Sequence, residues 1–144
     1  MNVRRHRWTW LPLITVMLLM LTSVAAARWT SRTFITDVGY VRATHTLVVQ
    51  GYVTDASKRT LHRRPIYVRV RLLRRTSSGS WKRVEKKTGS TITRDTSAFS
   101  IGLRALRRGT CRAKARFLGN SFYAPSHAVF GPFNCSGRYL PTPL

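Results

Sequence analysis

The sequence predicts an all-β sandwich of about seven strands that follows an amino-terminal signal-peptide helix. Three observations support this fold class. After residue 27, apolar and polar residues alternate with a period of two in segments rich in Val, Ile, Thr, Tyr and Phe. Clusters of Gly, Pro, Ser and Asp separate these segments, and the periodicity of amphipathic helices is nearly absent. Short alternating strands between regular turn signals are typical of two packed antiparallel sheets.

The amino terminus has the organisation of a secretory signal peptide over residues 1–27. Arg4, Arg5 and Arg7 form a positive region, an apolar segment runs from Trp8 to Leu21, and small residues precede a cleavage site after position 27. The alternative is an uncleaved anchor helix, but an apolar segment of about 14 residues is shorter than the roughly 20 that span a bilayer. We therefore expect the chain to be secreted or associated with the cell envelope, with no membrane span after cleavage.

The rest of the chain is long enough for one domain with its own core. We place this domain over residues 28–135 and expect a disordered tail over 136–144, where Pro141 and Pro143 lie. The whole chain has 26 Lys and Arg against four Asp and Glu, which gives a net charge of +22. A charge of this size and sign indicates polyanionic surroundings or a polyanionic partner.

Each predicted strand is an alternating segment bounded by turn residues. In chain order, the strands are Phe34–Val41, Thr46–Thr54, Pro65–Arg74, Ser80–Thr88, Ser97–Leu103, Thr110–Leu118 and Ala128–Cys135. A loop over 55–64 separates the second and third strands, and a Ser-Ser-Gly hairpin over 77–79 joins the third and fourth. Turns at 107–109 and 119–126 flank the sixth strand.

The third strand divides its residues between two faces, because successive side chains in a strand point to opposite sides. The inward residues are Ile66, Val68, Val70 and Leu72, and the outward residues are Tyr67, Arg69, Arg71 and Leu73. In the hairpin with the fourth strand, placing Leu73 opposite Trp81 also pairs Arg69 with Glu85 and Val70 with Val84. This register brings a cation to the only glutamate and an indole to a leucine.

The sixth strand repeats this pattern around a cysteine. Cys111, Ala113, Ala115 and Phe117 face inward, and Arg112, Lys114 and Arg116 face outward. Two cysteines in an exported chain predict one disulfide, here between Cys111 and Cys135. If Cys111 lies opposite Cys135, Phe117 lies opposite Val129, and Lys114 lies opposite Pro132. Because proline lacks an N–H donor, the last strand is then expected at a sheet edge.

Several motifs occur in an order that resembles bacterial immunoglobulin-like domains of exported proteins. The motifs are "LVVQGYVTD", "PIYVRVRLLRR", "GSWKRV", "TSAFSIGL" and "ARFLGNSFYAPSHA". The matching residues are Gly51, Pro65, Trp81, Phe99, Gly119, Asn120, Tyr123, Pro125 and Ser126. Ala98 stands where the pattern usually has Gly, and the cysteine pair and cationic faces are not part of it. The portion "GYVTD…RPIYVRV" is also similar to the prealbumin-like sandwiches of carboxypeptidase regulatory-like domains. The resemblance implies an immunoglobulin-like sandwich that acts as a spacer, adhesion or binding module, without catalytic residues.

The residue inventory indicates a protein that is not an enzyme and holds no metal or cofactor. After the signal peptide the acids are Asp37, Asp55, Glu85 and Asp95, and the histidines are His45, His62 and His127. No two acids are close in sequence, no nucleophile motif accompanies a histidine, and the histidines lack metal-ligand spacing. Solvated loop histidines are the expected outcome.

The cationic strand faces are the remaining functional signal. In an immunoglobulin-type order the third and sixth strands are neighbours, so their outward cations form one patch. The predicted polyanion-binding residues are Arg69, Arg71, Arg83, Lys87, Arg112, Lys114 and Arg116, with Tyr67 and Trp81 as stacking platforms. The alternative is an inert, solvated basic surface, which leaves unexplained why one sign of charge dominates. Like charges across strands repel, and an anionic partner relieves this repulsion.

These observations predict a secreted binding or structural module that contacts an anionic polymer. Candidate polymers are phosphate-rich wall polymers, acidic polysaccharides and extracellular DNA. The principal alternative is a protein–protein interaction module, similar to an adhesin or inhibitor, that uses a strand edge or the loops at Arg63-Arg64 and Phe122-Tyr123. A cationic antimicrobial protein is disfavoured because the core uses the apolar faces. The sequence leaves the oligomeric state undetermined.

Overall fold

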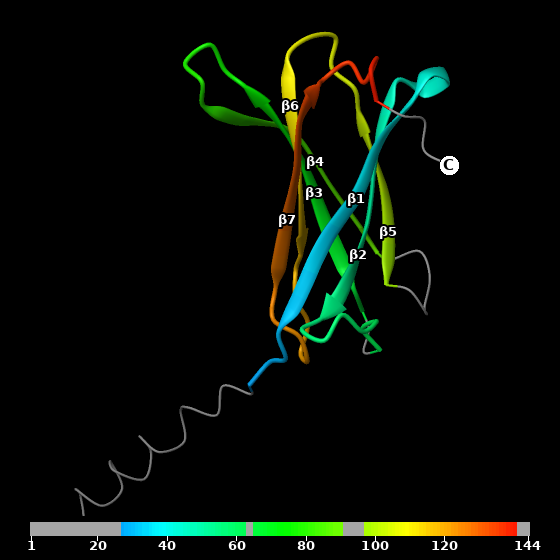
Figure 1. Cartoon of the computed structure of the whole chain (residues 1–144), viewed down its shortest axis with the longest axis vertical. Helices are drawn as coiled ribbons and strands as arrows, with labels where there is room; N and C mark the ends of the chain where they lie inside the picture. The colour runs from blue at the N-terminus through cyan, green and yellow to red at the C-terminus, as the bar shows by residue number, and fades with distance from the viewer. Residues whose placement is uncertain (1–26, 63–64, 91–96, 141–144) are drawn as a thin grey trace, which may run out of the picture.

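The structure, a computed structural model, describes residues 27–62, 65–90 and 97–140 (Figure 1). The predicted signal peptide up to residue 26, the Arg63-Arg64 loop and Asp95 lie outside the described residues. The strands are β1 (Ser31–Val41), β2 (Thr46–Asp55), β3 (Tyr67–Arg75), β4 (Trp81–Ser90), β5 (Ala98–Arg104), β6 (Thr110–Phe117) and β7 (Ser126–Asn134). A short 3-10 helix, η1 (Arg42–Thr44), joins β1 to β2. All seven predicted strands are present.

The strands form two antiparallel sheets that pack face to face. One sheet has three strands in the order β1-β2-β5, and the other has four in the order β4-β3-β6-β7. This is an antiparallel β-sandwich in which the fourth strand pairs with the third. The predicted neighbour relationship of the third and sixth strands is confirmed, as is the edge position of the last strand, which contains Pro132.

The inward residues of both sheets make one core. Val68, Val70 and Leu72 of β3 are fully buried, as are Ala113, Ala115 and Phe117 of β6. In the three-stranded sheet, Phe99 of β5 lies directly opposite Gly51 of the neighbouring strand β2. A Cβ added to Gly51 would come 2.6 Å from the Phe99 ring. A glycine at position 51 therefore makes room for the aromatic ring that the core requires.

The register between β3 and β4 differs from the predicted one. Leu72 lies opposite Glu85 and Leu73 opposite Arg83, with a bulge at Val84 between them. Arg69 consequently faces Thr88, to which its Nε donates a 3.4 Å hydrogen bond, and Trp81 lies opposite Arg75 rather than Leu73. The predicted pairing of Arg69 with Glu85 is wrong, because the turn and the bulge add residues that strand alternation does not reveal.

The register between β6 and β7 is also shifted from the predicted one. Cys111 lies opposite Phe133, Ala113 opposite Phe130, and Lys114 opposite Val129. An irregularity at this point places Gly131 and Pro132 of β7 against a single residue of β6, which reverses the expected facing of β7. Val129, predicted to face the core, lies on the outer face and is 52% exposed.

The predicted disulfide joins Cys111 to Cys135 and ties the start of β6 to the residue after β7. Beyond it, Ser136 and Gly137 are buried, and Leu140 packs against the core. The side chain of Asn134 accepts hydrogen bonds from the backbone N–H and the hydroxyl of Ser136. Residues 136–140 of the predicted tail therefore pack against the domain, and residues 141–144 lie outside the described chain.

Candidate anion-binding face

The outer face of the four-stranded sheet concentrates positive charge. On its two central strands, Arg69 lies opposite Arg116, Arg71 opposite Lys114, and Leu73 opposite Arg112. On β4, Lys86 lies opposite Arg71, and Arg83 lies opposite Leu73. Arg75, opposite Trp81 at the end of β3, lies on the same side. We call the other seven cations of this surface the basic face: Arg69, Arg71, Arg83, Lys86, Arg112, Lys114 and Arg116. None of the strand residues that the registers place on this outer face is acidic.

Local sequence and sheet topology together produce the basic face. In β3 and β6 the apolar residues of the alternating pattern must point into the core, which leaves every intervening cation on the opposite side. Antiparallel pairing then sets cation against cation, with Cβ atoms about 4.5–5.5 Å apart. Such like-charge pairs destabilise a sheet, so the fold retains a repulsion that bound anions would relieve.

Most of the predicted anion-binding residues lie together, with one exception. Arg69, Arg71, Arg83, Arg112, Lys114 and Arg116 share the basic face. Lys87 does not, because it lies opposite the inward-facing Val70 and therefore on the inner side of the edge strand. Lys86 occupies the outer position instead. The bulge at Val84 shifts the facing of the residues that follow it by one, and alternation read from the start of the strand cannot detect this shift.

The two predicted stacking platforms have different surroundings. Tyr67 is 46% exposed at the beginning of β3, on the same outer face as the cations. The guanidinium carbon of Arg112 lies 4.2 Å from the centroid of the Trp81 ring, a cation–π contact. Arg112 Nε is buried and has no hydrogen-bond partner among the described residues. One face of Trp81 is therefore occupied by Arg112, and Tyr67 is the more open ring.

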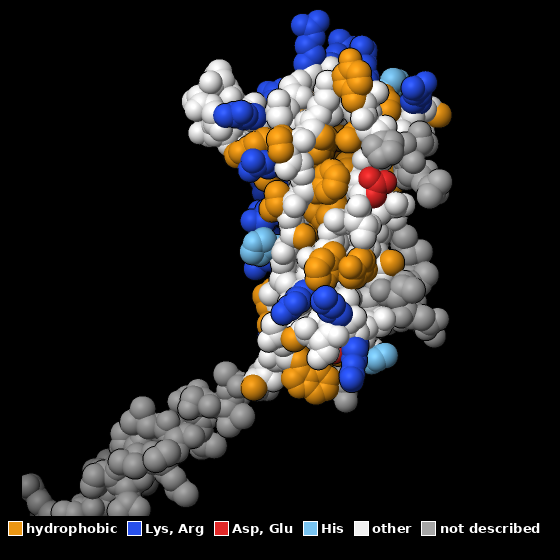
Figure 2. All heavy atoms as spheres, viewed as in Figure 1, with side chains coloured by type: hydrophobic (Ala, Val, Ile, Leu, Met, Phe, Trp, Pro, Cys, Tyr) orange, Lys and Arg blue, Asp and Glu red, His pale blue; other side chains and the backbone are white. Residues whose placement is uncertain are grey.

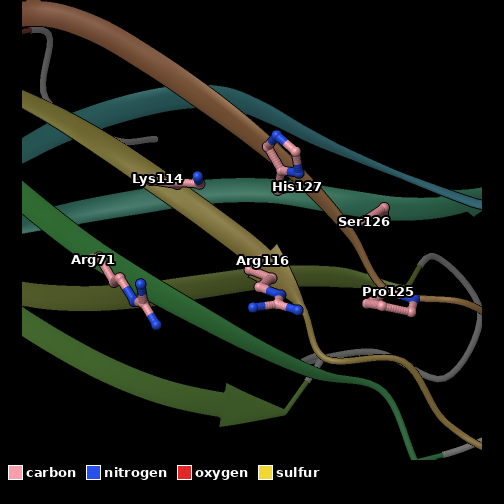
Figure 3. Close-up of a pocket in the computed structure, with 6 residues that line it drawn as sticks. All are labelled: Arg71, Lys114, Arg116, Pro125, Ser126 and His127. Carbon is pink, nitrogen blue, oxygen red and sulfur yellow. The ribbon is translucent and has the colours of Figure 1, made fainter.

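A small hollow opens on the basic face beside the edge strand β7 (Figure 3). Its volume is about 160 Å³, and it is lined by Arg71, Lys114, Arg116, Pro125, Ser126 and His127. The guanidinium groups of Arg71 and Arg116 extend on the same side of the sheet, from adjacent strands (Figure 3). Three cations from two strands thus surround a space that suits a single phosphate, sulfate or carboxylate group.

The edge of this hollow is held by hydrogen bonds to the other sheet. The Ser126 hydroxyl lies 2.8 Å from Ser31 Oγ and 2.7 Å from Thr33 Oγ1, both on β1. His127, expected to be a solvated loop residue, is in β7 directly opposite Arg116. Sequence reasoning missed this position because it began the last strand at residue 128, after the histidine.

The described residues offer little support for a metal site or for free carboxylates in a catalytic role. They contain no group of three or more His, Cys, Asp or Glu side chains placed to hold a metal ion. The Glu85 carboxylate accepts a 2.7 Å hydrogen bond from the Arg104 backbone N–H, and Asp55 accepts one from the Arg59 backbone N–H. In the same part of the chain, no helix is long and apolar enough to cross a membrane.

No protein-family model matches the chain, and comparisons with curated proteins and with solved structures return no similar protein. What the basic face binds is therefore inferred from its own charge and geometry. Figure 2 shows Lys and Arg side chains along the side of the molecule formed by β7 and the strands behind it. Further cations gather at the uppermost end of the molecule in this view.

Proposed function

We propose that this protein is an exported, non-catalytic immunoglobulin-like module that binds an anionic polymer through the basic face. The observation that carries the proposal is the set of cross-strand cation pairs, Arg69 with Arg116 and Arg71 with Lys114, on a face without acidic strand residues. Cation rows about 4.8 Å apart, with a repeat of about 6.7 Å along each strand, present a regular grid to a linear chain of negative groups.

The polymer class follows from the chemistry of the grid. Arginine guanidinium groups bind phosphate, sulfate and carboxylate oxygens through paired hydrogen bonds, and the face is open rather than enclosed. An open face suits a repeating polymer such as a wall phosphate polymer, an acidic polysaccharide or extracellular DNA. The Cys111–Cys135 disulfide accords with an oxidising compartment outside the cytosol, where such polymers are found.

Neutralising matched sets of cations tests this proposal. One variant changes Arg69, Arg71, Lys114 and Arg116 to Gln. Arg112 is left intact because it packs on Trp81. The control variant changes four exposed cations away from the basic face, Arg28, Arg32, Arg59 and Lys82, to Gln and loses the same charge. Binding to duplex DNA is measured at salt concentrations from roughly 50 to 300 mM, because phosphate contacts make the affinity strongly salt-dependent in this interval.

The two variants should behave differently. The slope of log affinity against log salt is negative. We expect the face variant to make it less steep by about 3 to 4, near 0.9 for each lost phosphate contact. The control should change the slope by less than about one. Equal losses in both variants would overturn the proposal, because affinity would then follow total charge rather than the basic face.

A second candidate function, protein–protein interaction, is favoured by exposed aromatic residues at the end of the sandwich where β1 begins. Trp29 and Phe122 are 57% and 37% exposed there, and the Trp29 ring makes an edge-on contact with Tyr123. Large aromatic side chains near a loop are common anchors in protein interfaces. Salt-insensitive capture of a single protein partner, lost on Trp29→Ala and retained in the face variant, would favour this function.

A further inference from the structure

A second basic region lies at the end of the sandwich that bears the disulfide, outside the basic face. Two adjoining hollows, of about 570 and 440 Å³, share Tyr40, His45 and Arg138 in their walls. Their walls come from three distant segments: η1 with its flanking residues, the loop that follows β5, and the turns after β7. These segments meet at the end of the sandwich that is uppermost in Figure 1. We call this region the end basin.

One lobe of the end basin is cationic. Arg104, Arg107, Arg108 and Arg138 line the larger hollow, together with His45 and without any acidic residue. The carboxylate of Glu85 reaches this segment and accepts a hydrogen bond from the Arg104 backbone N–H. Four guanidinium groups around one hollow would attract an anion, and the volume of the hollow lies in the range of small-molecule pockets.

The other lobe is aromatic. Tyr40 and Tyr139 line the smaller hollow with Arg42, and the Tyr139 side chain is 85% exposed. The Tyr40 hydroxyl lies 2.8 Å from His45 Nδ1. Gly137, with a φ of +69°, packs so close to Tyr40 that an added Cβ would lie 2.5 Å from its ring. Tyr40 is therefore held in place, whereas Tyr139 offers an open ring.

Backbone hydrogen bonds hold the arginine loop against the disulfide. The Leu106 N–H donates to the Cys135 carbonyl at 3.0 Å, and the Cys135 N–H donates to the Gly109 carbonyl at 2.9 Å. On the other side, the Ala105 N–H donates to the His45 carbonyl at 2.9 Å. The loop that presents Arg107 and Arg108 is thus anchored at three points, so less order has to be gained when a ligand binds.

We propose that the end basin binds a nucleotide unit, with its phosphate in the arginine lobe and its base on the tyrosine lobe. Guanidinium groups bind phosphate oxygens in pairs, and tyrosine rings stack on bases of any sequence. A cationic lobe beside an aromatic lobe matches this division of one ligand into a charged part and a flat ring. The unit is either a free mononucleotide or one residue of a single strand. This inference does not rest on the proposed function, because it uses none of the residues of the basic face.

The test compares probes of equal charge that differ only in their bases. Fluorescently labelled oligothymidylate of 12 units is compared with an abasic 12-unit strand by anisotropy. The protein is the variant with Arg69, Arg71, Lys114 and Arg116 changed to Gln, so that the basic face contributes little. We expect the oligothymidylate to bind about tenfold more tightly, within the range measured for stacking of one base.

Two further variants in this background locate the binding. Tyr139→Ala, at a highly exposed position that folding does not need, should remove the base preference and leave affinity for the abasic strand unchanged. Changing Arg107, Arg108 and Arg138 to Gln should weaken both probes, and thymidine monophosphate should compete if the ligand is a free nucleotide but not if it is a strand. Equal affinity of the two strands, or a base preference that survives Tyr139→Ala, would overturn the proposal. Failure of the basic-face proposal would show separately, as unchanged DNA affinity when the face is neutralised.

Discussion

The two sheets of the sandwich share one core but have very different outer faces. On the three-stranded sheet, the outward strand residues include only two cations, Arg32 and Arg104, one near each end. Between them lie Asp37 and the stacked rings of Phe34 and Tyr52, whose centroids are 4.9 Å apart. The four-stranded sheet presents the seven cations of the basic face and no outward acidic strand residue.

This contrast bears on the origin of the positive charge. A general preference for arginine in the chain would load both outer faces alike, because both consist of solvent-facing positions in alternating strands. The cations instead concentrate on one sheet, where they repel one another across strands. Uneven placement at a cost in stability is expected of a binding surface and not of a merely soluble one. The comparison therefore favours the basic face as the functional side.

The largest effects on stability should come from substitutions in the core, where a residue of either sheet is expected to contribute equally to the free energy of unfolding. Phe99 in the three-stranded sheet and Phe117 in the four-stranded sheet are both buried, so changing either to Ala should lower the free energy of unfolding by about 3 to 5 kcal/mol. Urea titration followed by fluorescence and by circular dichroism should give coincident transitions for both variants. Leu at either position provides a milder control. Separate transitions for the two probes would mean that the sheets do not share one cooperative core.

The disulfide should matter next, and its local effect should fall on the four-stranded sheet and the end basin. Changing Cys111 and Cys135 to Ser opens a loop with a sequence separation of 24 and should cost roughly 3 kcal/mol by the chain-entropy estimate. Because the Cys135 carbonyl accepts a hydrogen bond from Leu106 and so anchors the arginine loop, the variant should also bind both 12-unit strands more weakly at the end basin under conditions where it remains folded. Unchanged affinity for both strands would show that the arginine loop holds its position without the bridge.

The smallest effect should distinguish the two outer faces most directly. Lys114 lies between Arg71 and Val129, so Lys114→Glu should replace a repulsion by an attraction and stabilise the fold by about 0.5 kcal/mol. Gln50→Glu on the other sheet, opposite Asp37, should instead destabilise it by a few tenths of a kcal/mol, roughly the cost of a like-charge pair.

Urea midpoints measured at low salt test both signs, and the difference between the variants should shrink at about 1 M salt, where the screening length is about 3 Å. Lys114→Glu should also weaken polyanion binding. A loss of stability in Lys114→Glu would mean that the cation pairs on the basic face are not repulsive.

Strand positions and the facing of the central strands could be predicted from alternation alone, because the direction of a side chain in a strand depends only on its own backbone. Arg69, Arg71, Lys114 and Arg116 were assigned to one outer face on this basis, and the structure places them there. The edge strands were harder. Their registers depend on bulges, one at Val84 and one where Gly131 and Pro132 interrupt β7, and each reverses the facing of the residues beyond it.

The chain's own pattern thus determined the all-β class, the approximate position of each strand and the charge of the face that β3 and β6 turn to solvent. Only the tertiary structure decided that Lys86 rather than Lys87 joins the basic face and that His127 lies beside Arg116. It alone brought three loops together in the end basin. Two residues of its walls, Tyr40 and Tyr139, are nearly 100 residues apart in sequence. Local periodicity carries no information over such a separation. The physical reason is that facing is a local property of the backbone, whereas register and loop contacts are set by how distant segments pack.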